Sequence, residues 1–335
     1  MIQPLATSFL GLTLLMALSS TAHAALSVGT KKSWLESLKS CTTQCRPLAL
    51  DMLSRYQQAT PEAMLHISKS ASTTLLYFHS YSLNPRHKTD DISFLENELL
   101  AGDINIFAPV LTAHEERSTK EAFLKVTPKN WILDAELALH LASALGQRVV
   151  IKGMSLGGLL TTHLARKYPE KISKIIFVSP AFMITNRLNQ STCFGQTALV
   201  HSLAKSFASN LDHEYLDKYL NGACALAKTM QLVLNEVPLK LPTSYGEPTD
   251  SDHYMARLDQ VKALARSVEI PSMIFYSASD EALDTRSLDI FAKNLPRTHG
   301  SIRYTRVNHM DTLKNFDMPS ENSSAHGIMH DYIRN

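Results

Sequence analysis

Short apolar runs alternate with amphipathic stretches along most of the chain. A nearly continuous apolar run is typical of a strand that is buried on both faces of a sheet. Apolar residues that recur every three or four positions indicate a helix with one buried side. The runs predict strands over residues 73–79, 104–110, 148–152, 174–178, 273–277 and 301–307.

Helices are expected between these strands. Asn130 is predicted to cap a helix that Gly146 ends, and Pro169 is predicted to stop a second helix over residues 156–168. Similar spacing predicts helices around residues 34–38 in a polar N-terminal arm, around residues 288–295 and around residues 329–333.

Strands that alternate with helices predict an α/β fold, in which a mainly parallel sheet is flanked by helices. The alternation pauses over residues 183–268, which we interpret as a helical cap inserted over the sheet. Residues 25–182 and 269–335 are expected to form the core. In such sheets the chemistry lies at the carboxyl ends of the strands, so a site is expected in the loops there.

The first 24 residues differ from the rest of the chain. They carry no charged side chain, contain an apolar run from Phe9 to Leu18 and end in Ala22-His23-Ala24. This pattern is typical of a secretory signal peptide cleaved near Ala24, and a cytoplasmic start is the alternative. The run is about half of the roughly 20 residues that span a bilayer, so no transmembrane anchor is expected. We therefore expect a periplasmic or secreted mature chain.

The chain has four cysteines, Cys41, Cys45, Cys193 and Cys224. An even number suits the oxidising compartment that export would reach, and four cysteines allow three pairings. We expect the two local pairs, Cys41 with Cys45 and Cys193 with Cys224. The alternative is four free thiols in a reducing compartment, whereas a zinc site is disfavoured because no close CxxC pair is present.

The balance of charged residues limits which kinds of partner are expected. Basic and acidic residues nearly balance, 33 against 31, for a formal net charge of +2. No basic stripe interleaved with aromatic residues is present, so no nucleic acid partner is expected. Hydrophobic residues make up 44% of the chain, which is enough to bury a large core.

The sequence Gly153-Met154-Ser155-Leu156-Gly157 lies where a predicted strand turns into a predicted helix. A G-x-S-x-G pattern in this setting is typical of a nucleophile elbow, in which a strained turn exposes the serine hydroxyl. Gly153 and Gly157 would let the strand and helix approach closely. The alternative is a glycine-rich turn with an inert serine.

A nucleophilic serine needs a base and a group that orients the base. Asp280 follows a later predicted strand and His309 follows the last one, which gives the chain order serine, acid, histidine. We therefore predict Ser155, Asp280 and His309 as the catalytic residues. Asp284 is the second candidate acid, but it is better explained as a helix cap. Asp311 is too close in sequence to His309 to orient it.

The oxyanion of an acyl-transfer intermediate needs backbone N–H donors. The first predicted donor is the N–H of Leu156, directly after the nucleophile. The second is the N–H of Tyr81, in the loop that follows the first predicted strand of the core. His79 ends that strand, and its imidazole is expected to bond to the loop backbone without taking part in proton transfer.

With these motifs the chain resembles the serine hydrolases of the α/β-hydrolase superfamily. It is most similar to the group of monoacylglycerol lipases, lysophospholipases and serine aminopeptidases. The resemblance covers roughly residues 73–313 apart from the cap. The matching segments read LLYFHSYS, IFAPVLTAHE, WILDAELALHLASALG, VVIKGMSLGG, IFYSASDEAL and VNHMDTL.

Two loops depart from the pattern of that group. The early loop usually reads His-Gly, and here it is His79-Ser80. A later loop usually reads Pro-Gly-His-Gly, and residues 111–115 lack both glycines. In that group the later loop often borders the substrate, so its departure bears on which substrates are expected.

The resemblance implies hydrolysis through an acyl-enzyme without a metal or organic cofactor. Acylglycerols, lysophospholipids or similar acyl esters are the expected substrates, with transient contact at a membrane surface as a further expectation. An aminopeptidase or amidase is the alternative, which would need an acidic anchor for the substrate amine, such as Glu236 or Glu247. A non-catalytic binding protein on the same scaffold is the third hypothesis.

Overall fold

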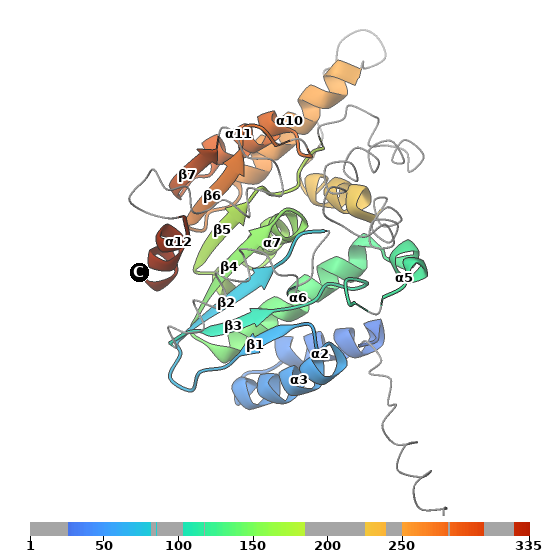
Figure 1. Cartoon of the computed structure of the whole chain (residues 1–335), viewed down its shortest axis with the longest axis vertical. Helices are drawn as coiled ribbons and strands as arrows, with labels where there is room; N and C mark the ends of the chain where they lie inside the picture. Colours follow the sequence, from blue (N-terminus) through green and yellow to red (C-terminus); the bar gives the residue numbers. More distant parts are fainter. Residues whose placement is uncertain are drawn as a thin grey trace, which may run out of the picture.

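The structure is a computed structural model that describes residues 26–81, 85, 103–116, 118–184, 225–238, 250–280, 282–304 and 325–335. A single sheet runs through the middle of the molecule, with α2 and α3 beside one edge and α10 and α11 beside the other (Figure 1). Within these residues no helix is both long and apolar enough to cross a membrane.

The sheet has seven strands in the order β1-β3-β2-β4-β5-β6-β7. Every neighbouring pair is parallel except β1 and β3, which are antiparallel. This arrangement confirms the predicted α/β class. The strands are β1 (Met64–His66), β2 (Thr73–Phe78), β3 (Asn105–Ala108), β4 (Arg148–Met154), β5 (Lys174–Val178), β6 (Ser272–Ser277) and β7 (Thr298–Tyr304).

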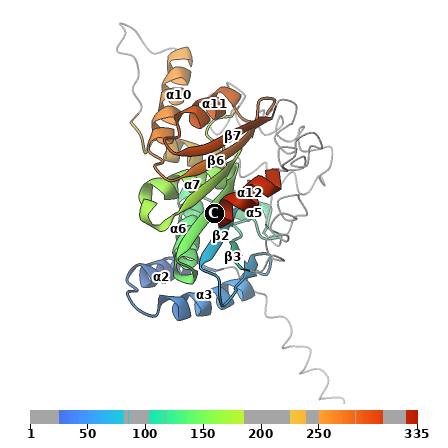
Figure 2. The same cartoon turned by 90° about the vertical axis from the view of Figure 1, so that its left-hand side faces the viewer.

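Helices lie on both faces of this sheet. In Figure 2, α6 and α7 lie on one side of the strands and α12 lies on the other. Residues 225–234 are also helical. The labelled helices are α2 (Val28–Lys39), α3 (Cys45–Ala59), α5 (Lys120–Lys125), α6 (Pro128–Leu145), α7 (Leu156–Lys167), η1 (Pro169–Lys171), α10 (Asp250–Arg266), α11 (Thr285–Asn294) and α12 (Ala325–Arg334).

Two hydrophobic cores explain why the central strands read as continuous apolar runs. Alternate strand residues, such as Phe78 and Ile151, face the core shared with α6, α7 and α11. Their neighbours, such as Tyr77 and Val150, face the second core, which includes Met329 of α12. Both faces of each central strand are therefore buried, as expected for a parallel sheet.

Several boundaries differ from the sequence-based expectation, and two of these differences have a clear physical reason. The helix predicted to start at Asn130 begins at Pro128, with Thr127 as its N-cap; Asn130 completes a capping box by accepting the Thr127 N–H at 2.8 Å. Proline is favoured at the first helical position, which explains the earlier start. The last strand starts at Thr298, where its pairing with β6 begins. Its residues are exposed or half-buried, so they form no apolar run that would mark this start in the sequence.

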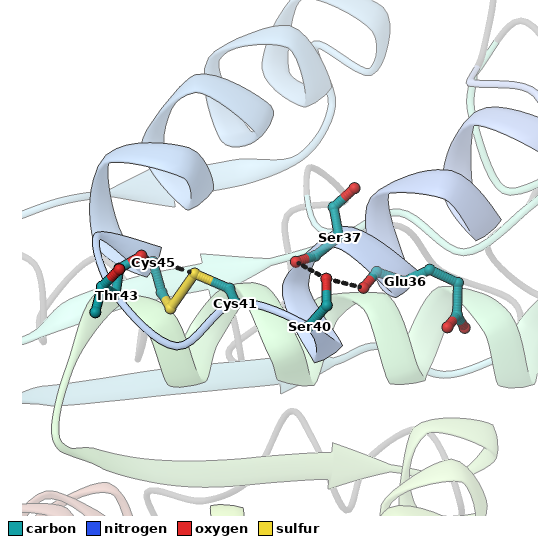
Figure 3. The surroundings of a disulfide bond; sticks show 6 residues. All are labelled: Glu36, Ser37, Ser40, Cys41, Thr43 and Cys45. Atoms are coloured by element: carbon teal, nitrogen blue, oxygen red, sulfur yellow. Dashed lines mark hydrogen bonds between the residues drawn. A yellow bond between two sulfur atoms is a disulfide. The ribbon is translucent and has the colours of Figure 1, made fainter.

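The N-terminal arm contains α2 and α3, joined by a disulfide between Cys41 and Cys45 (Figure 3). This bond confirms one of the two expected pairs. The other pair, Cys193 and Cys224, lies outside the described residues, as does the predicted signal peptide. The strand β1 and the helix α3 were not predicted. β1 has only three residues, whereas α3 buries apolar residues at helical spacing that the sequence analysis did not use, namely Ala49, Met52, Leu53 and Tyr56.

A buried ion pair attaches this arm to the core. Lys31 Nζ of α2 lies 2.6 Å from Asp134 Oδ1 of α6, and both side chains are almost fully buried. The second carboxylate oxygen of Asp134 accepts the N–H and the hydroxyl of Thr112, both at 2.6 Å. Lys31 therefore neutralises a carboxylate that also fixes the loop after β3.

Replacing Lys31 with methionine is expected to lower the free energy of unfolding by about 3 kcal/mol, because the Asp134 carboxylate would stay buried without its cation. Urea denaturation of the purified variant measures this change. The exposed neighbour Lys32 offers the matched control, and Lys32→Met should stay within about 0.5 kcal/mol of the parent. Equal effects of the two substitutions would contradict the role of the ion pair.

Candidate active site

Ser155 occupies the turn between β4 and α7 with φ 49° and ψ −111°. A positive φ is rare for a residue with a side chain and indicates local strain. The surrounding backbone holds this conformation: the Ser155 N–H donates to the Val178 carbonyl at 2.9 Å, and the Ser155 carbonyl accepts the Leu159 and Ala181 N–H groups. The predicted strand–turn–helix setting of Ser155 is therefore present.

The glycines on either side of Ser155 permit close contact between the strands and the helix. A Cβ atom at Gly153 would lie 2.3 Å from Thr161 Oγ1 and 2.6 Å from the Gly157 carbonyl oxygen. A Cβ atom at Gly157 would lie 2.1 Å from the Phe78 carbonyl oxygen of β2. No side chain fits at either position without a movement of backbone, so α7 packs directly on the ends of β4 and β2.

Asp280 follows β6 at the carboxyl edge of the sheet, the same edge at which β4 ends in Ser155. It is buried, and its Oδ1 accepts the N–H groups of Ala282 at 3.0 Å and Leu283 at 2.8 Å. These bonds fix the direction of the carboxylate within its own turn.

Asp284, the second candidate acid, has the capping role that its position predicts. Its Oδ1 accepts the Ser287 N–H at 2.7 Å at the start of α11, and its Oδ2 accepts the Tyr254 hydroxyl at 2.9 Å. Both carboxylate oxygens are thus occupied by structural bonds. The geometry favours Asp280 over Asp284 as the acid of the site.

The predicted base, His309, lies outside the described residues, and so does Glu247. Of the predicted site residues, the structure brings Ser155, Leu156 and Asp280 to one edge of the sheet, together with the loop that carries Tyr81. Within the described part of the chain, no three His, Cys, Asp or Glu side chains are grouped so that they would hold a metal ion.

His79 fixes the loop that carries Tyr81. Its Nε2 accepts the Leu111 N–H at 3.1 Å, so the proton lies on Nδ1, which donates to the Ser80 carbonyl at 2.7 Å. This bonding confirms the backbone role expected for His79. The described peptide bonds are all trans, so the Tyr81 N–H points away from the His79 ring. Leu156 is the first residue of α7, where N–H groups have no partner within the helix.

His114 is a second residue that holds this loop, and the sequence analysis did not assign it a role. It is fully buried, and its Nε2 lies 2.7 Å from the Tyr81 carbonyl. Its ring packs against Phe123 and Trp131. His114 is the histidine of the later loop that departs from the family pattern, but the sequence does not indicate its partner, which is a backbone carbonyl from a loop 33 residues earlier.

Residues 129–310 match the sequence model of the serine aminopeptidases of family S33. This match covers more than half of the chain. The chain belongs to the S33 serine aminopeptidase family. Membership agrees with the resemblance seen in the sequence and with the α/β-hydrolase architecture. No curated protein matches the sequence.

Several solved structures are similar to this S33-family chain at low sequence identity. A structure reported for LipS and LipT, two metagenome-derived lipolytic enzymes, is 15% identical with a TM-score of 0.51, covering 81% of this chain and 96% of that one. A 2-hydroxy-6-oxo-6-phenylhexa-2,4-dienoate hydrolase from Rhodococcus sp. strain RHA1 is 15% identical with a TM-score of 0.49, covering 81% and 93%. A bacterial membrane phospholipase A is 17% identical with a TM-score of 0.49, covering 97% and 98%.

A partly buried charge network joins the elbow helix of this S33-family hydrolase to the region predicted as the cap. His163 of α7 bonds to Glu236 through Nδ1 and lies 3.3 Å from Glu136 of α6 through Nε2. Arg166 binds the second carboxylate oxygen of Glu236, and Lys167 binds Glu136. Both oxygens of Glu236 are occupied, which argues against Glu236 as an anchor for a substrate amine.

The network shifts the pKa values of its members. Burial acts to lower the pKa of His163, but its hydrogen bonds to the Glu136 and Glu236 carboxylates outweigh burial and raise that pKa above 6.5. Burial acts to raise the pKa of Glu136, but hydrogen bonds from His163 and Lys167 lower it to about 2. The two carboxylates on either side of His163 therefore favour its cationic form.

These shifts predict that the loss of folding stability caused by His163→Gln depends on pH. The pKa of His163 is higher in the folded protein than its unfolded value of 6.5. Its charged form therefore stabilises the fold fully below pH 6.5, and this stabilisation is lost as the pH rises through the folded-state pKa. The charged carboxylate of Glu136 stabilises the fold fully above pH 4.5, and this stabilisation is lost as the pH falls toward 2. The substitution should therefore cost about 2 kcal/mol at pH 5.5 and less at pH 9.

Denaturation of the parent and His163→Gln at both pH values measures this difference. His140, whose pKa burial lowers to about 4, is present in both proteins and cancels from the comparison. His253 is exposed on α10, so His253→Gln is the control that should show no such pH dependence. A cost that is equal or larger at pH 9 would disprove the charged role of His163.

Proposed function

We propose that this S33-family hydrolase cleaves carboxylic esters through an acyl-enzyme formed on Ser155. The observation that carries the proposal is the strained backbone of Ser155 in the turn between β4 and α7. A buried, oriented Asp280 at the same sheet edge adds support. A purely binding protein would need neither feature.

The proposed mechanism begins when Ser155 Oγ attacks the acyl carbonyl carbon. His309 takes the hydroxyl proton and passes it to the leaving alcohol, while Asp280 holds the imidazole in the required tautomer. The N–H groups of Leu156 and Tyr81 bind the oxyanion of the tetrahedral intermediate. Water, activated by His309, then hydrolyses the acyl-enzyme and restores Ser155.

The fixed surroundings of these groups would favour the reaction. The two N–H groups bound to Asp280 Oδ1 keep that carboxylate in place, and His79 keeps the Ser80–Tyr81 peptide in place. Donors that are already oriented need no reorganisation when negative charge develops on the substrate oxygen.

An acylglycerol, lysophospholipid or similar acyl ester is the proposed substrate class. The second candidate is release of N-terminal residues from peptides, which the family description favours. We place the ester first, because Glu236 is already bound by His163 and Arg166. We also propose that residues 1–24 direct the chain to the periplasm or the outside of the cell.

A substrate panel tests the proposal. The mature chain would be assayed with p-nitrophenyl acyl esters, a monoacylglycerol, a lysophosphatidylcholine and aminoacyl p-nitroanilides. We expect turnover of acyl esters and little or none of the anilides. Turnover of anilides alone would favour the peptidase, and no turnover together with no labelling by a fluorophosphonate would favour a binding protein.

A further inference from the structure

Ser80 carries a buried hydroxyl in the loop that holds the predicted oxyanion donor Tyr81. The residue is 2% exposed, and its Oγ has no hydrogen-bond partner within the described part of the chain. His79 donates a hydrogen bond to the backbone carbonyl of Ser80, so this carbonyl has a partner while the side-chain hydroxyl has none. Related hydrolases usually carry glycine here, so the family pattern does not assign this hydroxyl.

The pairing of β2 with β4 places the loop that carries Ser80 beside the turn that carries the nucleophile. On β2 and β4, Tyr77 pairs with Lys152 and Phe78 pairs with Gly153. β2 ends at Phe78 and β4 ends at Met154, so Ser80 and Ser155 both lie just beyond the ends of these two paired strands. Neighbouring strands lie about 4.8 Å apart, so the two backbones run close together at this edge.

The contact between β2 and α7 places the end of β2 beside the other oxyanion donor. The Phe78 carbonyl lies so close to Gly157 that a Cβ atom there would be 2.1 Å away. The Leu156 N–H belongs to the residue just before Gly157. Ser80 lies in the loop two residues beyond the end of β2, directly before the predicted donor Tyr81.

We infer that the Ser80 hydroxyl is a third donor to the substrate oxyanion, beside the N–H groups of Leu156 and Tyr81. The inference rests on the proposed function. When the carbonyl oxygen gains negative charge, the Ser80 O–H donates to it without losing another bond. Ser80 keeps its proton throughout, so the step needs no other reactant.

An unpartnered buried hydroxyl costs free energy in the resting protein, since it has given up its bonds to water. A developing oxyanion would supply the missing partner, and the stabilisation would then be gained in the transition state. The bond from His79 to the Ser80 carbonyl limits backbone movement at this residue. Ser80 would therefore act as a catalytic residue of the hydrolase.

The test compares Ser80→Ala with the parent on a short p-nitrophenyl ester, together with the affinity for an alkylboronic acid that forms a tetrahedral adduct with Ser155. We expect kcat to fall about 10- to 100-fold with KM within about twofold, and the boronic acid to bind more weakly by a similar factor. Ser80→Thr, which keeps a hydroxyl, should recover part of the lost kcat. Ser80→Gly gives the same comparison if the alanine variant does not fold.

A kcat within twofold of the parent in a folded Ser80→Ala or Ser80→Gly variant would overturn the inference, while the ester hydrolase would stand. A lower kcat together with a lower thermal stability and an unchanged affinity for the boronic acid would also overturn it, because a purely structural role of Ser80 would explain that result. A parent chain that turns over no ester and takes up no fluorophosphonate would contradict the proposed function, and the Ser80 assignment with it.

Discussion

Replacing Ser155 with alanine is expected to lower kcat for a p-nitrophenyl acyl ester by about 10⁴-fold or more, because no other group would form the acyl-enzyme. The side chain is small, and the φ of 49° at this position is strained for serine and alanine alike. The fold should therefore be retained. Steady-state kinetics with the purified parent and variant measure the effect, and thermal unfolding checks the fold.

Ser143 provides a matched control for this experiment. It is a partly buried serine of α6 whose hydroxyl donates to the Leu139 carbonyl within its own helix. Ser143→Ala should leave kcat within about twofold of the parent and change stability by at most about 1 kcal/mol. If Ser155→Ala retained the activity of the Ser143 control, Ser155 would not be the nucleophile.

Gly157→Ala is expected to have the largest effect on structure and activity together. The added methyl group would lie 2.1 Å from the Phe78 carbonyl oxygen and 2.7 Å from its carbonyl carbon. Because these are backbone atoms, the start of α7 would have to move away from β2. We expect a loss of about 3 kcal/mol in the free energy of unfolding. Displacement of the Leu156 N–H should lower kcat on the order of 100-fold.

Urea denaturation and ester kinetics measure these two effects. Gly300 of β7 is the matched control, since a Cβ atom there would meet nothing within 4 Å. Gly300→Ala should leave both quantities near the parent values. A Gly157→Ala variant that matched this control would show that α7 does not need close contact with the end of β2.

The sequence carries enough information to predict the central sheet, because its strands are buried on both faces. The segment from Lys174 to Val178 is predicted with the boundaries that the structure has. Tyr77 and Val150 face one core while Phe78 and Ile151 face the other, so the central strands are apolar at most of their positions. Helix ends were also predictable where proline or glycine fixes them, as at Gly146.

The edges of the sheet were harder to predict, for a physical reason. β7 alternates between exposed and half-buried residues, so it gives no apolar run, and its start at Thr298 follows from pairing with β6. β1 is a three-residue strand at the opposite edge. Such short or exposed strands are stabilised by backbone pairing with a neighbour, which is not visible in the local sequence.

Within the candidate site, the motif located Ser155, and the order of strands indicated Asp280. The roles of His114 and Ser80 needed coordinates. His114 acts on a carbonyl of a distant loop, and Ser80 combines burial, a hydroxyl without a partner in the described residues and a place next to Tyr81. Neither property is encoded in a spacing or a motif. His309 and the pair Cys193–Cys224 remain predictions from sequence.

The central claim is that Ser155 is an activated nucleophile, and mapping a covalent adduct tests it most directly. The purified chain would be treated with a fluorophosphonate, digested and examined by peptide mass spectrometry, with Ser155→Ala and His309→Ala treated in parallel. We predict one phosphonyl adduct on Ser155, no adduct in the Ser155→Ala chain and much slower labelling in the His309→Ala chain. An adduct on another residue, or a folded parent chain without any adduct, would contradict the account.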